Sequence, residues 1–168
     1  MRRSLFRLEI KARAGRKVFW TDECGVDHRL YRQHARAPRG EKIYQTVAGS
    51  RRGRTSILSA YDGEKLVAPI LCEGSCDRDL FNEWLEKYFL PVIPEGSVGV
   101  LDNASFHRSP QSREIAGKFQ VELLFLPTCS PDLNRIEPKW DQLKSLVKKN
   151  PNTENRVDSI GNAILMLL

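Results

Sequence analysis

Short apolar runs bounded by polar turns fill much of the first half of the chain, and this pattern predicts β-strands. The runs are residues 18–21, 43–48, 56–60 and 66–71. Because short turns at residues 49–54 and 61–64 separate the later runs, the pattern favours an antiparallel meander. Phe6, Leu8 and Ile10 also alternate with charged residues, which leaves open whether the first 15 residues form an edge strand or a basic arm.

Helical spacing of apolar residues begins near residue 79 and ends at two prolines, Pro91 and Pro94. The elements expected after it are a buried strand at 98–101, a helix at 109–119, a strand at 121–126 and a helix whose apolar face runs from Ile136 to Val147. Residues 157–167 again have helical spacing. This order predicts an α/β fold in which helices flank a mixed sheet.

The composition favours one globular domain. The chain has 168 residues, of which 40% are hydrophobic and 29% are charged, so a disordered chain or a coiled coil is not expected. The longest apolar run, residues 163–168, is far shorter than the roughly 18 residues that span a bilayer. No secretion signal opens the sequence, so we expect a cytoplasmic protein with no membrane partner.

Positive charge is concentrated near the N-terminus. Residues 1–54 hold 15 Lys and Arg against 5 Asp and Glu, a net charge of +10 within a chain whose total is +6. This asymmetry favours a polyanion such as nucleic acid as the partner, although a solvated basic face would have the same composition.

The four cysteines do not form a recognisable metal motif. Cys72 and Cys76 have a spacing found in zinc sites, but no second pair of cysteines or histidines follows at zinc-finger spacing. Reduced structural thiols are therefore the expected state. The glycine-containing segment at 49–55 is one residue short of a phosphate-binding loop and has Arg54 where that loop has lysine, so we interpret it as a basic turn.

Three acidic residues stand where α/β folds place their sites. Asp22 ends a strand and points away from Glu23, Asp102 ends the buried strand at 98–101, and Glu137 begins a helix. Each also has a structural interpretation; for example, Asn134 and Glu137 have the spacing of a helix-capping box. Together they supply oxygen ligands of the kind that hold Mg²⁺ or Mn²⁺.

Three segments resemble the catalytic blocks of DDE transposases, in the bacterial insertion-sequence branch related to mariner elements. They are residues 20–25 (WTDECG), 101–107 (LDNASFH) and 126–137 (LPTCSPDLNRIE). The 34 residues between Asp102 and Glu137 match the spacing of this branch. The resemblance extends from about Val18 to Lys149, and several motifs in the right order make it specific.

The resemblance implies a ribonuclease-H-like catalytic domain at residues 18–150, preceded by a basic arm at 1–17 and followed by a helical tail at 151–168. Asp22, Asp102 and Glu137 would bind two Mg²⁺ or Mn²⁺ ions. The implied reactions are cleavage of DNA at element ends with water, followed by attack of the freed 3′-hydroxyl on target DNA. Asn103 and His107 match motif positions that would orient these groups.

The sequence also departs from the family pattern. Thr128, Cys129 and Arg135 replace Pro, Tyr and Pro, and Arg135 could pair with Glu137 or contact a phosphate. The family's usual helix-turn-helix region does not precede the first catalytic strand, so we expect a catalytic portion that is truncated or encoded separately. Two alternatives stay open, namely a nuclease of the same fold without strand transfer and an inactive DNA-binding remnant.

The expected partner is DNA, both as element ends and as target. The candidate phosphate contacts are arginines of the basic first third, namely Arg29, Arg32, Arg36, Arg39, Arg51, Arg52 and Arg54. From the resemblance we also expect a homodimer in the active complex, a nucleoid-associated location and a separate helix-turn-helix protein that recognises the element ends.

Overall fold

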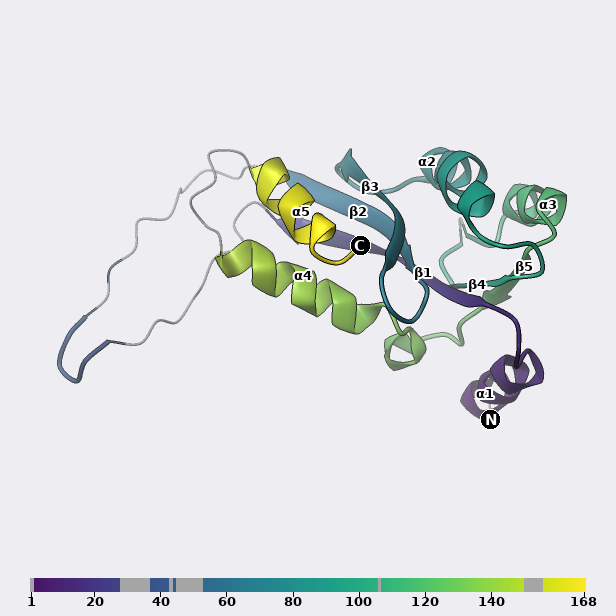
Figure 1. The fold of residues 1–168 in the computed structure, drawn as a ribbon, viewed down its shortest axis with the longest axis horizontal. Coiled ribbons are helices and arrows are strands. Elements are labelled where there is room, and N and C mark those ends of the chain that lie inside the picture. The colour runs from purple at the N-terminus through teal and green to yellow at the C-terminus, as the bar shows by residue number, and fades with distance from the viewer. Residues whose placement is uncertain (1, 28–36, 43, 45–52, 106, 150–155) are drawn as a thin grey trace.

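A five-stranded mixed sheet forms the centre of the protein (Figure 1). The computed structural model describes residues 2–27, 37–42, 44, 53–105, 107–149 and 156–168. The strands are β1 (Val18–Asp27), β2 (Arg54–Tyr61), β3 (Leu66–Glu73), β4 (Val98–Leu101) and β5 (Glu122–Phe125), in the spatial order β3-β2-β1-β4-β5. The first three strands form an antiparallel meander, and β1, β4 and β5 run parallel to one another. The predicted mixed sheet is therefore confirmed.

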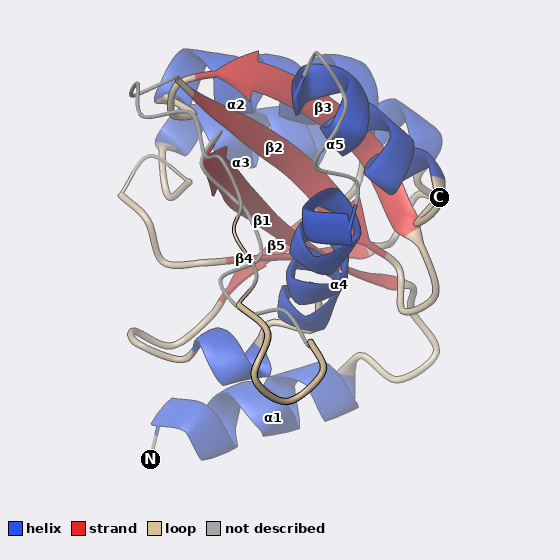
Figure 2. Cartoon of the chain, turned by 90° about the vertical axis from the view of Figure 1, so that its left-hand side faces the viewer, coloured by secondary structure: helices blue, strands red, loops and turns tan. Residues whose placement is uncertain are grey.

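Helices cover both faces of this sheet (Figure 2). Apolar side chains of α1 (Arg2–Ala12), α4 (Glu137–Lys149) and α5 (Arg156–Leu165) pack in a cluster on one face. The second cluster, on the other face, contains side chains of α2 (Arg78–Trp84) and α3 (Pro110–Lys118). Single turns complete the order, with a π-helical turn at Leu85–Phe89 and 3-10 turns at Leu90–Val92 and Pro131–Leu133.

Local sequence explains where α2 and α3 begin. The Asp77 carboxylate accepts a hydrogen bond from the Leu80 backbone N–H at 2.9 Å, which caps α2. The Ser109 hydroxyl accepts one from the Ser112 N–H at 3.1 Å, and Pro110 occupies the first turn of α3. Both helices therefore start within a residue of their predicted positions.

The first residues of the chain form the helix α1 and not an edge strand. The apolar residues Phe6 and Ile10 lie four positions apart, which places them on one helical face against the core, whereas Leu5 and Leu8 are exposed. Alternation was a misleading signal here, since the pattern contains both periods and the docking of Phe6 decides between them.

Part of the basic first third lies outside the described residues. The predicted strand at 43–48 falls largely on positions 43 and 45–48, and the basic turn at 49–54 falls largely on 49–52, none of which the structure describes. In the described part of the chain, none of the helices has the length and apolar character needed to cross a membrane.

An ion cluster attaches the segment after α1 to the sheet. Arg13 Nε donates to Glu122 Oε1 at 3.0 Å, and Arg16 forms a second ion pair with the same carboxylate. The hydrogen bond from Arg13 is the largest influence on this group. Together with the pair to Arg16 it outweighs the opposing effect of burial and lowers the pKa of Glu122 to about 2.

Replacing Glu122 with Gln should therefore destabilise the fold in a pH-dependent way. A carboxylate whose pKa is lowered from 4.5 to about 2 by folding stabilises the protein above pH 4.5, and this contribution is lost as the pH falls through 2. Because the carboxylate is one-third exposed, we expect a loss on the order of 1 kcal/mol at pH 7. Urea denaturation at pH 7 and pH 2.5 measures it, with Glu95→Gln on an exposed loop as the control. A deficit that persists unchanged at pH 2.5 would contradict this assignment.

Candidate active site

Asp22 lies in β1 on the face of the sheet that α4 covers. The residue lies opposite Ser59 of β2, and the Trp140 indole N–H of α4 donates to its Oδ2 at 3.2 Å. Glu23 points to the other face, where it accepts hydrogen bonds from the Ser56 hydroxyl at 2.8 Å and the Cys76 backbone N–H at 3.3 Å. Strand alternation allows only one of these two acids at the α4 face, as the sequence predicts, and the contact with Trp140 places Asp22 there.

Asp102 follows the last residue of β4 and is half-buried. Its Oδ1 accepts a hydrogen bond from the Ala104 backbone N–H at 3.0 Å and a second from His107 Nδ1. His107 is buried, and its ring lies 4.2 Å from the Phe81 ring. Burial alone would raise the pKa of Asp102, but the hydrogen bonds from His107 and Ala104 outweigh it, so the pKa is lowered. Asp102 therefore remains a fixed negative charge.

Glu137 is the first residue of α4. The capping-box interpretation of Asn134 is wrong, because its side-chain amide N–H donates to the Thr21 carbonyl of β1 at 3.3 Å. This bond orients the amide, ties the loop before α4 to the strand that carries Asp22, and aligns the two elements. Asn134 is buried, and its Oδ1 accepts no hydrogen bond from the described residues.

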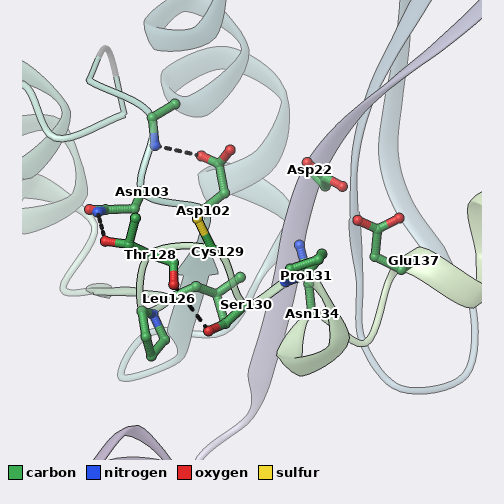
Figure 3. A pocket seen from close by; sticks show the side chains of 12 residues that line it. Asp22, Asp102, Asn103, Leu126, Thr128, Cys129, Ser130, Pro131, Asn134 and Glu137 are labelled. Atoms are coloured by element: carbon green, nitrogen blue, oxygen red, sulfur yellow. Dashed lines mark hydrogen bonds between the residues drawn. The ribbon is translucent and has the colours of Figure 1, made fainter. Parts of the chain in front are cut away.

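The three carboxylates line one cavity of about 320 Å³. It lies beyond the carboxyl ends of β4 and β5, the usual place for a site in an α/β sheet. Figure 3 shows Asp22 and Glu137 near one another, with Asp102 across the cavity. The Asp102 carboxylate is held there by the Ala104 backbone N–H. The remaining lining comes from Asn103, Ala104, Asn134 and the segment 126–131.

Burial and the like charges of neighbouring carboxylates make Asp22 a weaker acid than an ordinary aspartate. Burial is the largest cause, and repulsion from Glu137 and Asp102 adds to it, so the pKa of Asp22 rises to about 7 despite the hydrogen bond from Trp140. A cation would relieve this repulsion. The donors around the cavity are carboxylate, amide and hydroxyl oxygens together with one thiol, that of Cys129. The oxygens predominate, and they fit Mg²⁺ and Mn²⁺ better than Zn²⁺. Within the described residues, however, no three His, Cys, Asp or Glu side chains are already gathered at metal-binding distances.

A comparison with known families decides the classification. A model described as DDE superfamily endonuclease matches residues 17–158, which is most of the chain. The chain belongs to the DDE superfamily of endonucleases. A search of curated proteins finds no match.

Solved structures share the ribonuclease-H-like fold of this DDE chain. The Mos1 transposase catalytic domain with raltegravir and Mg aligns with a TM-score of 0.67 at 13% identity, over 99% of this chain and 80% of that chain. The Mos1 mariner paired-end complex with Mn aligns at 0.65 and 14% identity, over 99% and 58%. A simian T-cell lymphotropic virus intasome aligns at 0.55 and 12% identity, over 89% and 47%. This chain thus spans less than two thirds of the longer Mos1 chains.

The other residues expected at the site of this DDE domain are distributed unevenly. Asn103 lines the cavity, and its amide donates to the Thr128 hydroxyl at 3.1 Å, whereas His107 lies behind Asp102 and does not line it. Arg39 is exposed, and Arg54 pairs with Glu23 at 3.4 Å on the opposite face of β1. The other candidate arginines of the first third lie outside the described residues, namely Arg29, Arg32, Arg36, Arg51 and Arg52.

Trp140, Asn134 and Thr128 belong to the site. The sequence names none of them as a site residue, although Thr128 and Asn134 lie within the motif segment at 126–137. From the sequence, Trp140 is expected only on the apolar face of its helix, and Asn134 is given only the role of a helix cap. One signal was available for Trp140, because it follows Glu137 by three residues and thus shares its side of α4. For the other two, only contacts between distant segments reveal the role.

The metal-free protein should become more stable when Asp22 is replaced by Asn. An acid whose pKa is raised from 3.8 to about 7 by folding stabilises the protein below pH 3.8, and this contribution is lost as the pH rises through 7. We therefore expect Asp22→Asn to melt at the same temperature as the wild type near pH 4. At pH 8 it should be more stable by an amount on the order of 2 kcal/mol.

Thermal melts in EDTA across this pH range test the prediction, with Glu95→Gln as a surface control. An advantage of Asp22→Asn that does not grow with pH would show that repulsion in the cavity is not its source.

Proposed function

We propose that this DDE domain is the catalytic domain of a DNA transposase of the mariner-related insertion-sequence branch. Its reactions would be cleavage of phosphodiester bonds at element ends and transfer of the resulting 3′-hydroxyl into target DNA. The observation that carries the proposal is the single cavity lined by Asp22, Asp102 and Glu137 in a chain of this family. Structures of similar fold include a Mos1 strand transfer complex, which supports the same assignment.

The three carboxylates would hold two Mg²⁺ or Mn²⁺ ions. The Oδ1 of Asn134, which accepts no hydrogen bond from the described residues, would be a further oxygen donor beside them. Such ions would supply charge stabilisation to the attacking and leaving oxygens of a phosphodiester in an in-line displacement. Neighbouring structures described with Mg or Mn support the choice of metal.

The chain's own side chains would prepare the site for this chemistry. Trp140 holds the Asp22 carboxylate by its indole N–H, and His107 and the Ala104 N–H hold Asp102 in a charged state. In hydrolysis, an oxygen of water forms a bond to phosphorus while the bond to the 3′-oxygen breaks, which leaves a 3′-hydroxyl and a 5′-phosphate. In strand transfer, that 3′-hydroxyl attacks a target phosphate and releases a 3′-hydroxyl of the target.

The partners of this domain follow from the same proposal. DNA would be bound as element ends and as target, with arginines of the basic first third on its phosphates. The active complex would be a homodimer, with a separate helix-turn-helix protein recognising the ends and the nucleoid as the location. Mos1 complexes described as paired-end assemblies support two ends being held together.

Asp102→Asn should abolish Mg²⁺- or Mn²⁺-dependent cleavage while leaving non-specific DNA binding within about twofold, because only a ligating charge is removed. The assay uses labelled duplexes carrying the element end, with Asp62→Asn on the β2–β3 turn as the matched control. As a readout besides activity, Mn²⁺ should raise the melting temperature of the wild type but not of Asp102→Asn. Unchanged cleavage by Asp102→Asn would remove this residue from the site.

Strand transfer separates a transposase from a nuclease of the same fold. Supplied with pre-cut ends that carry a free 3′-hydroxyl and with target DNA, the protein should join the two, and Asp102→Asn should not. Cleavage without any joined product would identify a nuclease. Neither reaction together with normal DNA binding would identify an inactive remnant.

A further inference from the structure

Three arginines near the cavity lie over aromatic rings. Arg108 and Arg113 approach the face of the same Phe125 ring, with Cζ 5.8 Å and 5.3 Å from its centroid. Arg135 lies over the Trp20 ring at 4.8 Å. These distances are those of cation–π contacts, which hold a guanidinium in place while leaving its N–H groups able to bind an anion.

Arg108 is connected to one side of the cavity by side-chain hydrogen bonds. Its guanidinium donates to Asn103 Oδ1 at 3.0 Å, and the Asn103 amide donates to the Thr128 hydroxyl at 3.1 Å. Asn103 and Thr128 both line the cavity. These hydrogen bonds hold the exposed guanidinium of Arg108 against Asn103, at the edge of the cavity.

Arg135 stands at the other side, between two residues that line the cavity, Asn134 and Glu137. Figure 3 shows Asn103 and Glu137 on opposite sides of the lining. Lys139, in the first turn of α4, has its Nζ 5.3 Å from the centroid of the Tyr61 ring. Because Tyr61 pairs with Trp20 across β1 and β2, two adjacent rings hold two cations.

None of these three arginines is neutralised within the described part of the chain. No carboxylate there forms an ion pair with Arg108, Arg113 or Arg135, and all three side chains are exposed. The sequence offered Glu137 as one possible partner of Arg135, and the structure places the guanidinium on Trp20 instead. The cavity between the arginines is lined by carboxylates, which repel a phosphate backbone.

We propose that Arg108 and Arg135 bind DNA phosphates on either side of the phosphodiester that enters the cavity, with Arg113 reinforcing Arg108. This inference deepens the proposed function and rests on it. It adds contacts at the cavity to those expected from the basic first third of the chain. Phe125 and Trp20 position the guanidinium groups before DNA arrives, which lowers the entropic cost of binding.

The experiment measures binding of the full chain to a fluorescent random-sequence duplex in EDTA at several salt concentrations. Each phosphate contact contributes about 0.9 to the slope of log affinity against log salt. Arg108→Gln and Arg135→Gln should each reduce the slope by about 1 and weaken binding roughly 3- to 10-fold at low salt. The matched control is Arg78→Gln, which removes an exposed arginine at the start of α2.

Two further variants separate charge from packing. Arg108→Lys should keep most of the slope, because the charge remains, whereas Phe125→Leu should weaken binding about 2- to 3-fold although no charge is lost. Melting temperatures within about 3 °C of the wild type establish that each variant is folded. Slopes for Arg108→Gln and Arg135→Gln that equal the slope of Arg78→Gln would overturn the proposal.

Cleavage of the element-end duplex in Mn²⁺ distinguishes this proposal from the proposed function. If the wild type cleaves while both arginine variants bind like the control, the inference fails and the function stands. If the wild type does not cleave while both variants lose affinity and slope, the function fails and the phosphate contacts stand.

Discussion

Asp22 of β1 and Glu137 of α4 are both acidic and line the same cavity, so folding must overcome the repulsion between their carboxylates. Burial and this repulsion raise the pKa of Asp22 to about 7. The opposing contribution comes from the apolar face of α4, where Trp140 and Leu143 are buried against the sheet, and from the Trp140 indole bonded to Asp22. Packing of α4 therefore places the carboxylates together at a cost that a bound cation would offset.

Asp102 has the opposite electrostatic character, although it lines the same cavity. His107 and the Ala104 N–H lower its pKa, and the Phe81 ring packs against the His107 ring. One carboxyl thus titrates near physiological pH while another stays charged, and this separation of pKa values in one site is typical of sites built for chemistry. If Arg108 and Arg135 bind phosphates as proposed, their exposed charges on the two sides of the negative cavity would draw a phosphate backbone toward the carboxylates.

Much of the fold was predictable because the signals for it are local. The change from strand to helical spacing near residue 79, the start of α3 after Ser109 and the apolar face of α4 all follow from residues close in sequence. The sequence leaves the first residues open between an edge strand and a basic arm, because Phe6 and Ile10 fit both periods and only docking against the core decides for the helix α1. The prediction failed at Asn134, whose partner is the Thr21 carbonyl more than a hundred residues away.

The sequence by itself determined the order of the three acidic residues, the spacing between Asp102 and Glu137, and that Asp22 and Glu23 point to opposite faces, because strand alternation is a property of neighbouring residues. Only the tertiary structure decided which side chains surround those carboxylates. Trp140 meets Asp22, His107 meets Asp102 and Arg135 meets Trp20 through contacts that the parallel pairing of β1 with β4 and the packing of α4 bring about. The pKa values of Asp22 and Asp102 and the positions of the exposed arginines beside the cavity depend on those contacts, which no local pattern encodes.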